Sequence, residues 1–140
     1  MNDMYKGMPF SPQATLADNI GEADTIIPVS DVSAFPDGPN YATIGTDTDG
    51  ETIRYATKTA SALSGCTRGV EGTAKAWQSG EVIARNFNSK DLDALQENIK
   101  ALNTTTDELG RDIAGLVVVG EDAPETGPAL WFDTTAREGA

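Results

Sequence analysis

Few side chains in this sequence can carry out covalent or acid–base chemistry. The chain contains no histidine, which removes the commonest general base and a very common metal ligand. A cysteine–histidine pair, a Ser-His-Asp triad and a histidine-containing zinc site are therefore excluded. The single cysteine, Cys66, is followed closely by Arg68, but we expect a small buried core residue there rather than an activated thiolate. The sequence predicts no catalytic residue and no enzyme activity.

The acidic stretch at residues 47–51 matches part of a calcium-binding loop. When Gly50 takes the sixth position of an EF-hand loop, the first ligand position falls on Gly45 and the twelfth on Ala56, neither of which has a ligating side chain. The stretch therefore predicts an acidic hairpin turn without a metal. The glycines at positions 65, 69, 72 and 80 are not spaced as a phosphate-binding loop, so we expect no nucleotide cofactor.

Two aromatic residues, Trp77 and Tyr41, are candidates for stacking on sugar rings if they are exposed. The competing interpretation is that they fill a core, which is the commoner role of tryptophan. Paired carboxylates of a glycoside hydrolase form a third, more distant hypothesis, because acidic residues are plentiful and their separations depend on the tertiary structure. Exposure of the two rings separates the first two interpretations.

The overall charge restricts the partners. With 10 basic and 22 acidic residues the net charge is −12, which repels nucleic acids and anionic membrane surfaces. No apolar run approaches the roughly 20 residues that span a bilayer, and the first residues lack the pattern of a secretory signal. We expect a protein that folds in a cytoplasm, binds no nucleic acid and does not insert into a membrane.

The first two thirds of the chain have the pattern of short strands. Residues 1–13 are rich in Met, Pro and Gly and predict an extended arm, either a docking peptide or a floppy terminus. Residues 14–87 predict a β-rich domain of five to seven strands, a small antiparallel barrel or sandwich. The predicted strands are residues 25–29, 41–44, 52–55, 63–67 and 81–84, and the second and third flank the turn at 47–50 as a hairpin.

The pattern changes at residues 88–116, which predict a long helix. Apolar residues recur at alternating steps of three and four, the heptad spacing of a coiled coil. Asn88 is the expected N-cap and Asp91 the third helical residue. The expected oligomer interface, which we call the seam, consists of Leu92, Leu95, Ile99, Leu102, Thr106, Leu109, Ile113 and Leu116.

Two interpretations of this helix differ in what covers the seam. The seam is narrow and runs for nearly four heptads, which favours association between copies over packing against the chain's own β-domain. The poor helix formers at 103–106 require packing to persist as a helix. Residues 117–140 predict a linker with one more short strand at 129–133, a β-tail that begins another module or pairs with a neighbouring chain.

The β-rich part resembles a small domain that recurs in bacteriophage and prophage tail-fibre and baseplate proteins. The matching pieces are IPVSD at 27–31, AFP at 34–36, YATIG at 41–45, ETIRY at 51–55, GCTRG at 65–69 and GT at 72–73. The segment GPALWFDT at 127–134 is similar to segments between tail-fibre modules, and together the two matches cover about two thirds of the chain.

The resemblance implies a non-enzymatic structural protein of the virion tail, assembled in the bacterial cytoplasm, with other tail or baseplate proteins as partners. It also implies a homotrimer, although the leucines and isoleucines of the seam by themselves lean towards a dimer. The sequence lacks a long repetitive shaft, which favours an attachment role over host recognition. The alternative function is a carbohydrate-binding module for host cell-surface glycans.

Overall fold

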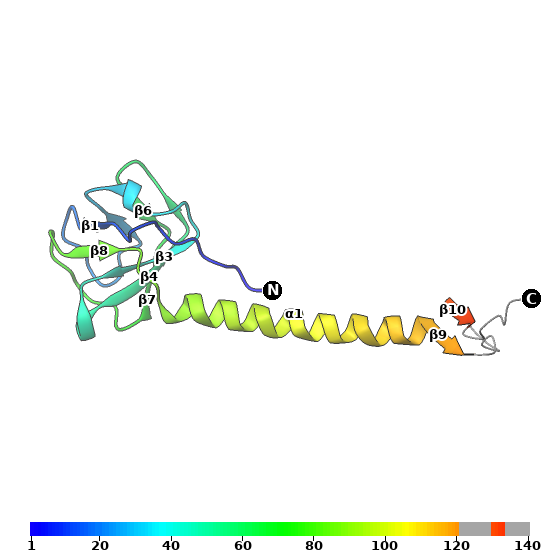
Figure 1. Cartoon of the computed structure of the whole chain (residues 1–140). Helices are drawn as coiled ribbons and strands as arrows, with labels where there is room; N and C mark the ends of the chain where they lie inside the picture. Colours follow the sequence, from blue (N-terminus) through cyan, green and yellow to red (C-terminus); the bar gives the residue numbers. More distant parts are fainter. Residues whose placement is uncertain (121–129, 134–140) are drawn as a thin grey trace, which may run out of the picture. The chain divides into compact units, whose positions relative to one another are not determined.

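The computed structural model describes residues 1–120 and 130–133, and the chain divides into two compact units. The first unit, Asp3–Leu92, is called the β-domain here. The second unit contains the remainder of the long helix and the strands that follow it. The fold is β plus α, as the sequence predicts (Figure 1).

The β-domain contains two antiparallel sheets. The larger has the order β1-β8-β3-β4-β7 and the smaller the order β2-β6-β5. Because β1 and β7 are unpaired on their outer sides, the larger sheet has two open edges, and the predicted barrel is wrong. The strands are β1 Gln13–Thr15, β2 Ile26–Pro28, β3 Asn40–Ile44, β4 Glu51–Tyr55, β5 Thr57–Lys58, β6 Ala62–Ser64, β7 Thr67–Glu71 and β8 Val82–Ala84.

The predicted hairpin is confirmed. Strands β3 and β4 pair from Asn40↔Tyr55 to Ile44↔Glu51, and the short helix η2, Asp47–Asp49, makes the turn. Another short helix, η1, spans Val32–Ala34. Pro28 lies in β2 at the edge of the smaller sheet, a position that tolerates a residue without a backbone N–H.

The predicted strand at 63–67 is wrong in one respect, because the chain turns a corner there. Residues 62–64 belong to the smaller sheet and residues 67–71 to the larger one. Gly65 occupies the corner with a φ of +64°, and a Cβ at this position would lie 2.9 Å from the Ala56 Cβ. Both facts favour glycine, so the change of sheet depends on a residue without a side chain.

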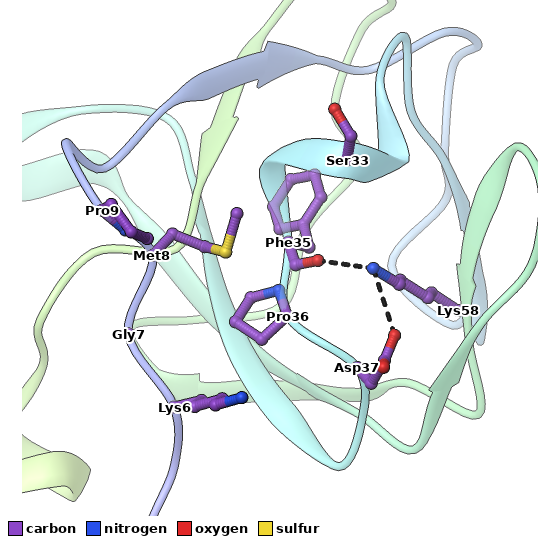
Figure 2. Close-up of a pocket in the computed structure, with 9 residues that line it drawn as sticks. All are labelled: Lys6, Gly7, Met8, Pro9, Ser33, Phe35, Pro36, Asp37 and Lys58. Atoms are coloured by element: carbon purple, nitrogen blue, oxygen red, sulfur yellow. Dashed lines mark hydrogen bonds and ion pairs between the residues drawn. The ribbon is translucent and has the colours of Figure 1, made fainter.

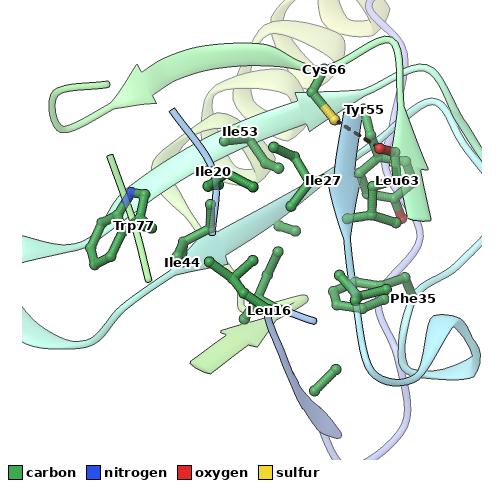
Figure 3. Packing of buried hydrophobic residues seen from close by; sticks show 14 of the residues in the cluster. Leu16, Ile20, Ile27, Phe35, Ile44, Ile53, Tyr55, Leu63, Cys66 and Trp77 are labelled. Atoms are coloured by element: carbon green, nitrogen blue, oxygen red, sulfur yellow. Dashed lines mark hydrogen bonds between the residues drawn. The ribbon is translucent and has the colours of Figure 1, made fainter. Parts of the chain in front are cut away.

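One hydrophobic cluster joins the two sheets (Figure 3). Ile44, Ile53 and Ile83 come from the larger sheet, and Ile27 and Leu63 from the smaller. The hydroxyl of buried Tyr55 donates to the Pro36 carbonyl oxygen at 2.8 Å, so its polar end has a partner inside the domain. Phe35 is buried in this cluster with an extended backbone, so it anchors the loop at 33–37 on the core.

The second unit is built on α1, which spans Ser89–Leu116 and continues from the last turn of the β-domain. Strand β9, Val117–Gly120, follows it directly and pairs in parallel with β10, Leu130–Asp133. The predicted strand at 129–133 is present as β10, and within the described residues it pairs with β9 of the same chain. The predicted linker at 121–128 lies outside the described residues.

Candidate functional site

The start of α1 is closed by two reciprocal hydrogen bonds. The Asp91 N–H donates to the Asn88 Oδ1, and the Asn88 N–H donates to the Asp91 Oδ2, each at 3.1 Å. This arrangement satisfies two of the backbone donors that a helix start leaves without partners. The expected cap at Asn88 is confirmed.

A buried arginine fixes the same turn to the β-domain. Arg85 makes a two-pronged ion pair with Asp91, at 2.8 Å to Oδ2 and 2.6 Å to Oδ1. Its Nε donates to the Lys6 carbonyl oxygen at 3.1 Å, and the Asn40 side chain donates to that oxygen at 2.9 Å. The N-terminal arm therefore contacts the domain at Lys6.

Beyond this turn the seam is exposed in the single chain. Exposed fractions rise from 43% at Leu92 to 58% at Ile113. The large exposed side chains of the row are Leu92, Leu95, Ile99, Leu102, Leu109 and Ile113. The polar member, Thr106, is exposed too, and the side chain of Leu116 lies outside the described residues. The helix thus carries a row of apolar side chains at coiled-coil spacing, each about half open to solvent.

The run of poor helix formers is accommodated by local hydrogen bonds. The hydroxyls of Thr104, Thr105 and Thr106 donate to the carbonyl oxygens of the residues four positions earlier, at 3.1, 3.0 and 2.9 Å. Such bonds satisfy the hydroxyl without a partner from elsewhere. Thr106 can therefore enter an apolar interface at less cost than a threonine with an unpaired hydroxyl.

The aromatic candidate Trp77 is buried. It is 8% exposed, its Nε1 donates to the Glu51 Oε2 at 2.8 Å, and the Lys75 ammonium lies 4.1 Å from the centre of a ring. The competing interpretation, that this ring fills a core, is confirmed, and its indole N–H is the partner of a buried carboxylate. Trp77 offers little surface on which a sugar could stack.

The second aromatic candidate, Tyr41, is buried as well. It is 7% exposed, and the Tyr5 ring of the N-terminal arm packs edge-on against it at 4.5 Å between ring centres. Burial, with the Tyr5 hydroxyl beside it, raises the pKa of Tyr41 to about 12. Tyr41 therefore does not meet the condition of exposure that stacking on a sugar requires, since the arm covers the ring.

The acidic turn supplies a structural ion pair instead of a cation site. Glu51 is fully buried, and its carboxylate accepts hydrogen bonds from Arg68 Nε at 2.7 Å, Arg68 Nη2 at 2.8 Å and the Gly69 N–H at 2.9 Å, besides that from Trp77. Burial by itself raises the pKa of this carboxyl, but the hydrogen bonds from Arg68, Trp77 and Gly69 outweigh it and hold the pKa below its ordinary value.

No metal centre is formed within residues 1–120 and 130–133, where no group of three or more acidic or cysteine side chains could hold an ion. Cys66 is buried in the hydrophobic cluster, as predicted, and burial raises the pKa of its thiol to about 11. A thiol with such a pKa is almost wholly protonated at neutral pH and is a poor nucleophile.

A cleft of the β-domain, about 590 Å³ in volume, lies between the N-terminal arm and the loop at 33–37 (Figure 2). Lys58 is one of the lining residues. Its ammonium group donates to the Phe35 carbonyl oxygen at 2.7 Å and forms an ion pair with Asp37 at 3.2 Å. Met8, Pro9 and Pro36 supply apolar surface. Lys58 thus holds the loop that forms one wall of the cleft.

Comparison with known proteins does not assign the chain to a family. No protein-family model matches the chain, and no curated protein matches it. In the part of the chain that the structure describes, no helix has the length and apolar character needed to cross a membrane.

Proposed function

We propose that the chain is a non-enzymatic structural component of a phage-type tail, in a fibre or baseplate, which attaches to a partner by its β-domain and joins copies of itself by its helix. The observation that carries this proposal is the exposed seam of α1. Six large apolar side chains at heptad spacing are 43% to 58% exposed, whereas those of the β-domain core are buried. Covering each of the six contributes about 1 kcal/mol.

The buried charges of the β-domain support a structural role. Glu51 is paired with Arg68, and Asp91 with Arg85, so these buried charges stabilise the domain itself. The resemblance to tail-fibre and baseplate domains supplies the proposed setting, a virion tail assembled in the bacterial cytoplasm. It also supplies the choice of a parallel trimer, which rests on this resemblance alone, since the seam composition by itself leans towards a dimer.

A test of this proposal measures the mass of the whole chain in solution by light scattering over a range of concentrations. We expect a trimer, and we expect the double variant Ile99→Asp with Leu102→Asp to be a monomer whose β-domain remains folded. Carboxylates in the seam lose hydration on association and repel one another. The matched control, Ala101→Asp with Thr104→Asp, adds the same charge off the seam and should remain a trimer.

A monomeric natural sequence at high concentration would refute association through α1. A dimer would retain the seam but refute the threefold arrangement. Dissociation of the control variant would show that added charge, rather than its position in the seam, disrupts the assembly. Circular dichroism and unfolding of the β-domain, followed through Trp77 fluorescence, distinguish loss of assembly from loss of folding.

A further inference from the structure

A second cleft of the β-domain has the chemistry of a binding site. It has a volume of about 310 Å³ and is lined by Thr43, Thr52, Glu71, Asn86, Phe87 and Asn88. These residues come from β3, β4, β7 and the segment that leads into α1. The volume lies at the lower end of the range of small-molecule sites, about 300–1,000 Å³, so it suits a single small ring.

Hydrogen bonds within the cleft determine which groups remain for a ligand. The Thr52 hydroxyl donates to the Glu71 Oε2 at 2.8 Å. Since that uses its only proton, Thr43 must be the donor in the 3.0 Å contact between the Thr43 and Thr52 hydroxyls. The Thr43 oxygen consequently keeps its acceptor capacity, and a ligand at this point has to bring a donor.

One residue that lines the cleft has a donor without a partner. The Asn88 Nδ2 is buried and makes no hydrogen bond within the described residues, although the Oδ1 of the same amide caps the helix. Buried donors almost always have an acceptor, because leaving one unpaired costs free energy. An acceptor brought into the cleft would satisfy this donor once a neighbouring side chain shifts.

The charge of the cleft argues against anionic ligands. Glu71 accepts hydrogen bonds from the Ser89 N–H at 3.0 Å, from the Ser89 hydroxyl and from Thr52. Burial acts to raise the pKa of Glu71, but these hydrogen bonds and the charge of Lys90 outweigh it, so the carboxylate remains ionised at neutral pH. An ionised acceptor attracts hydroxyl donors and repels carboxylates and phosphates.

An exposed aromatic ring completes the site. Phe87 is 74% exposed and lies between the two asparagines that line the cleft. An exposed aromatic face next to hydrogen-bonding groups suits a ligand with one apolar and several polar faces. Neither of the two buried rings, Trp77 and Tyr41, offers this.

We propose that this cleft, lined by Thr43, Glu71, Phe87 and Asn88, binds a small neutral saccharide. Sugar hydroxyls both donate and accept hydrogen bonds. One sugar ring can therefore donate hydrogen bonds to the Thr43 oxygen and to Glu71, and accept one from the Asn88 amide. Its C–H face would pack on the Phe87 ring. The site is separate from the seam and goes beyond the structural role proposed above.

The test titrates the whole chain with methyl α-D-glucopyranoside, methyl β-D-galactopyranoside and N-acetylglucosamine, each at millimolar concentration, and follows amide signals by NMR. We expect at least one sugar to shift the signals of Gly72, Asn86 and Asn88, including the Asn88 side-chain amide. Inorganic phosphate, the anionic probe, should leave them unchanged. Binding should be unaltered in the double variant Ile99→Asp with Leu102→Asp, which separates this site from assembly.

Thr43→Val is the decisive variant, because it removes the acceptor and keeps the shape and the strand preference. We expect it to weaken sugar binding about tenfold. Thr57→Val, an exposed strand threonine outside the cleft, is the matched control and should bind as the natural sequence does. The proposal is overturned if none of the sugars shifts these signals, or if Thr43→Val binds them as tightly as the natural sequence does. It is also overturned if phosphate, or the cationic probe methylamine titrated in the same way, binds in place of the sugars.

Discussion

Ile53 in β4 and Ile99 in α1 are the same residue in regular secondary structure, yet Ile53 is 0% exposed and Ile99 is 49% exposed. The contrast extends to the surroundings of each residue. The β-domain has a core of apolar side chains buried in one cluster, and its buried charges are paired within the same domain. The helix leaves six large apolar side chains of the seam about half exposed.

This difference shows which part of the molecule is self-sufficient. A domain with a closed core and paired buried charges can fold by itself, whereas an isolated helix draws most of its stability from packing on one face. Variants that destabilise the β-domain should therefore act on folding, and variants of the seam should act on association. Four predictions test this division, from the largest expected effect to the smallest.

The largest effect is expected at the ion pair of Glu51. Glu51→Gln leaves the buried Arg68 guanidinium without a countercharge and should lower the free energy of unfolding by about 3–5 kcal/mol. Urea unfolding followed by tryptophan fluorescence measures it. Glu81→Gln, at an exposed position next to β8, is the control and should change stability by less than about 0.5 kcal/mol. Equal effects of the two variants would show that the ion pair of Glu51 does not stabilise the domain.

The contrast between the two isoleucines can be measured directly. Ile53→Ala opens a cavity in the closed core and should lower the free energy of unfolding of the β-domain by about 2–5 kcal/mol. Ile99→Ala should leave that unfolding within about 0.5 kcal/mol and instead weaken association, as measured by sedimentation equilibrium. If Ile99→Ala destabilised the β-domain as strongly as Ile53→Ala, the two regions would not be independent.

Acid should affect the β-domain through Glu51 and Glu71. The pKa values of both carboxyls are lower in the folded protein than their ordinary value of 4.5, so the folded state binds protons less readily than the unfolded state. Their contribution to stability is complete above that value and is lost as the pH falls through the lower, folded values. Unfolding at pH 7 and at successively lower pH should show this loss, and Glu51→Gln should reduce the dependence. A pH-independent stability would contradict it.

The smallest effect is expected at the helix cap. Asn88→Ala removes the acceptor for the Asp91 N–H and should cost about 1 kcal/mol. Hydrogen exchange of the amides in the first turn of α1 should increase, while exchange in β3 and β4 stays unchanged. Faster exchange throughout the β-domain would show instead that the cap supports the whole domain and not just the helix start.

Local features of this protein were determined by the sequence alone. The hairpin around residues 47–50, the cap at Asn88 and the apolar row of α1 follow from spacing and turn chemistry within a few residues of one another. The burial of Cys66 also follows from residue type, because a free cysteine is among the residues most often buried. Such features need no knowledge of distant partners.

Only the tertiary structure decided which distant residues meet. Glu51 and Arg68 are 17 positions apart, and Trp77 reaches the same carboxylate from 26 positions away, so no local pattern could show that this ring is buried. The open edges of the sheets and the cleft beside Glu71 likewise depend on strand order. Periodicity shows which face of an element is apolar, but the element that covers this face is chosen by packing over the whole chain.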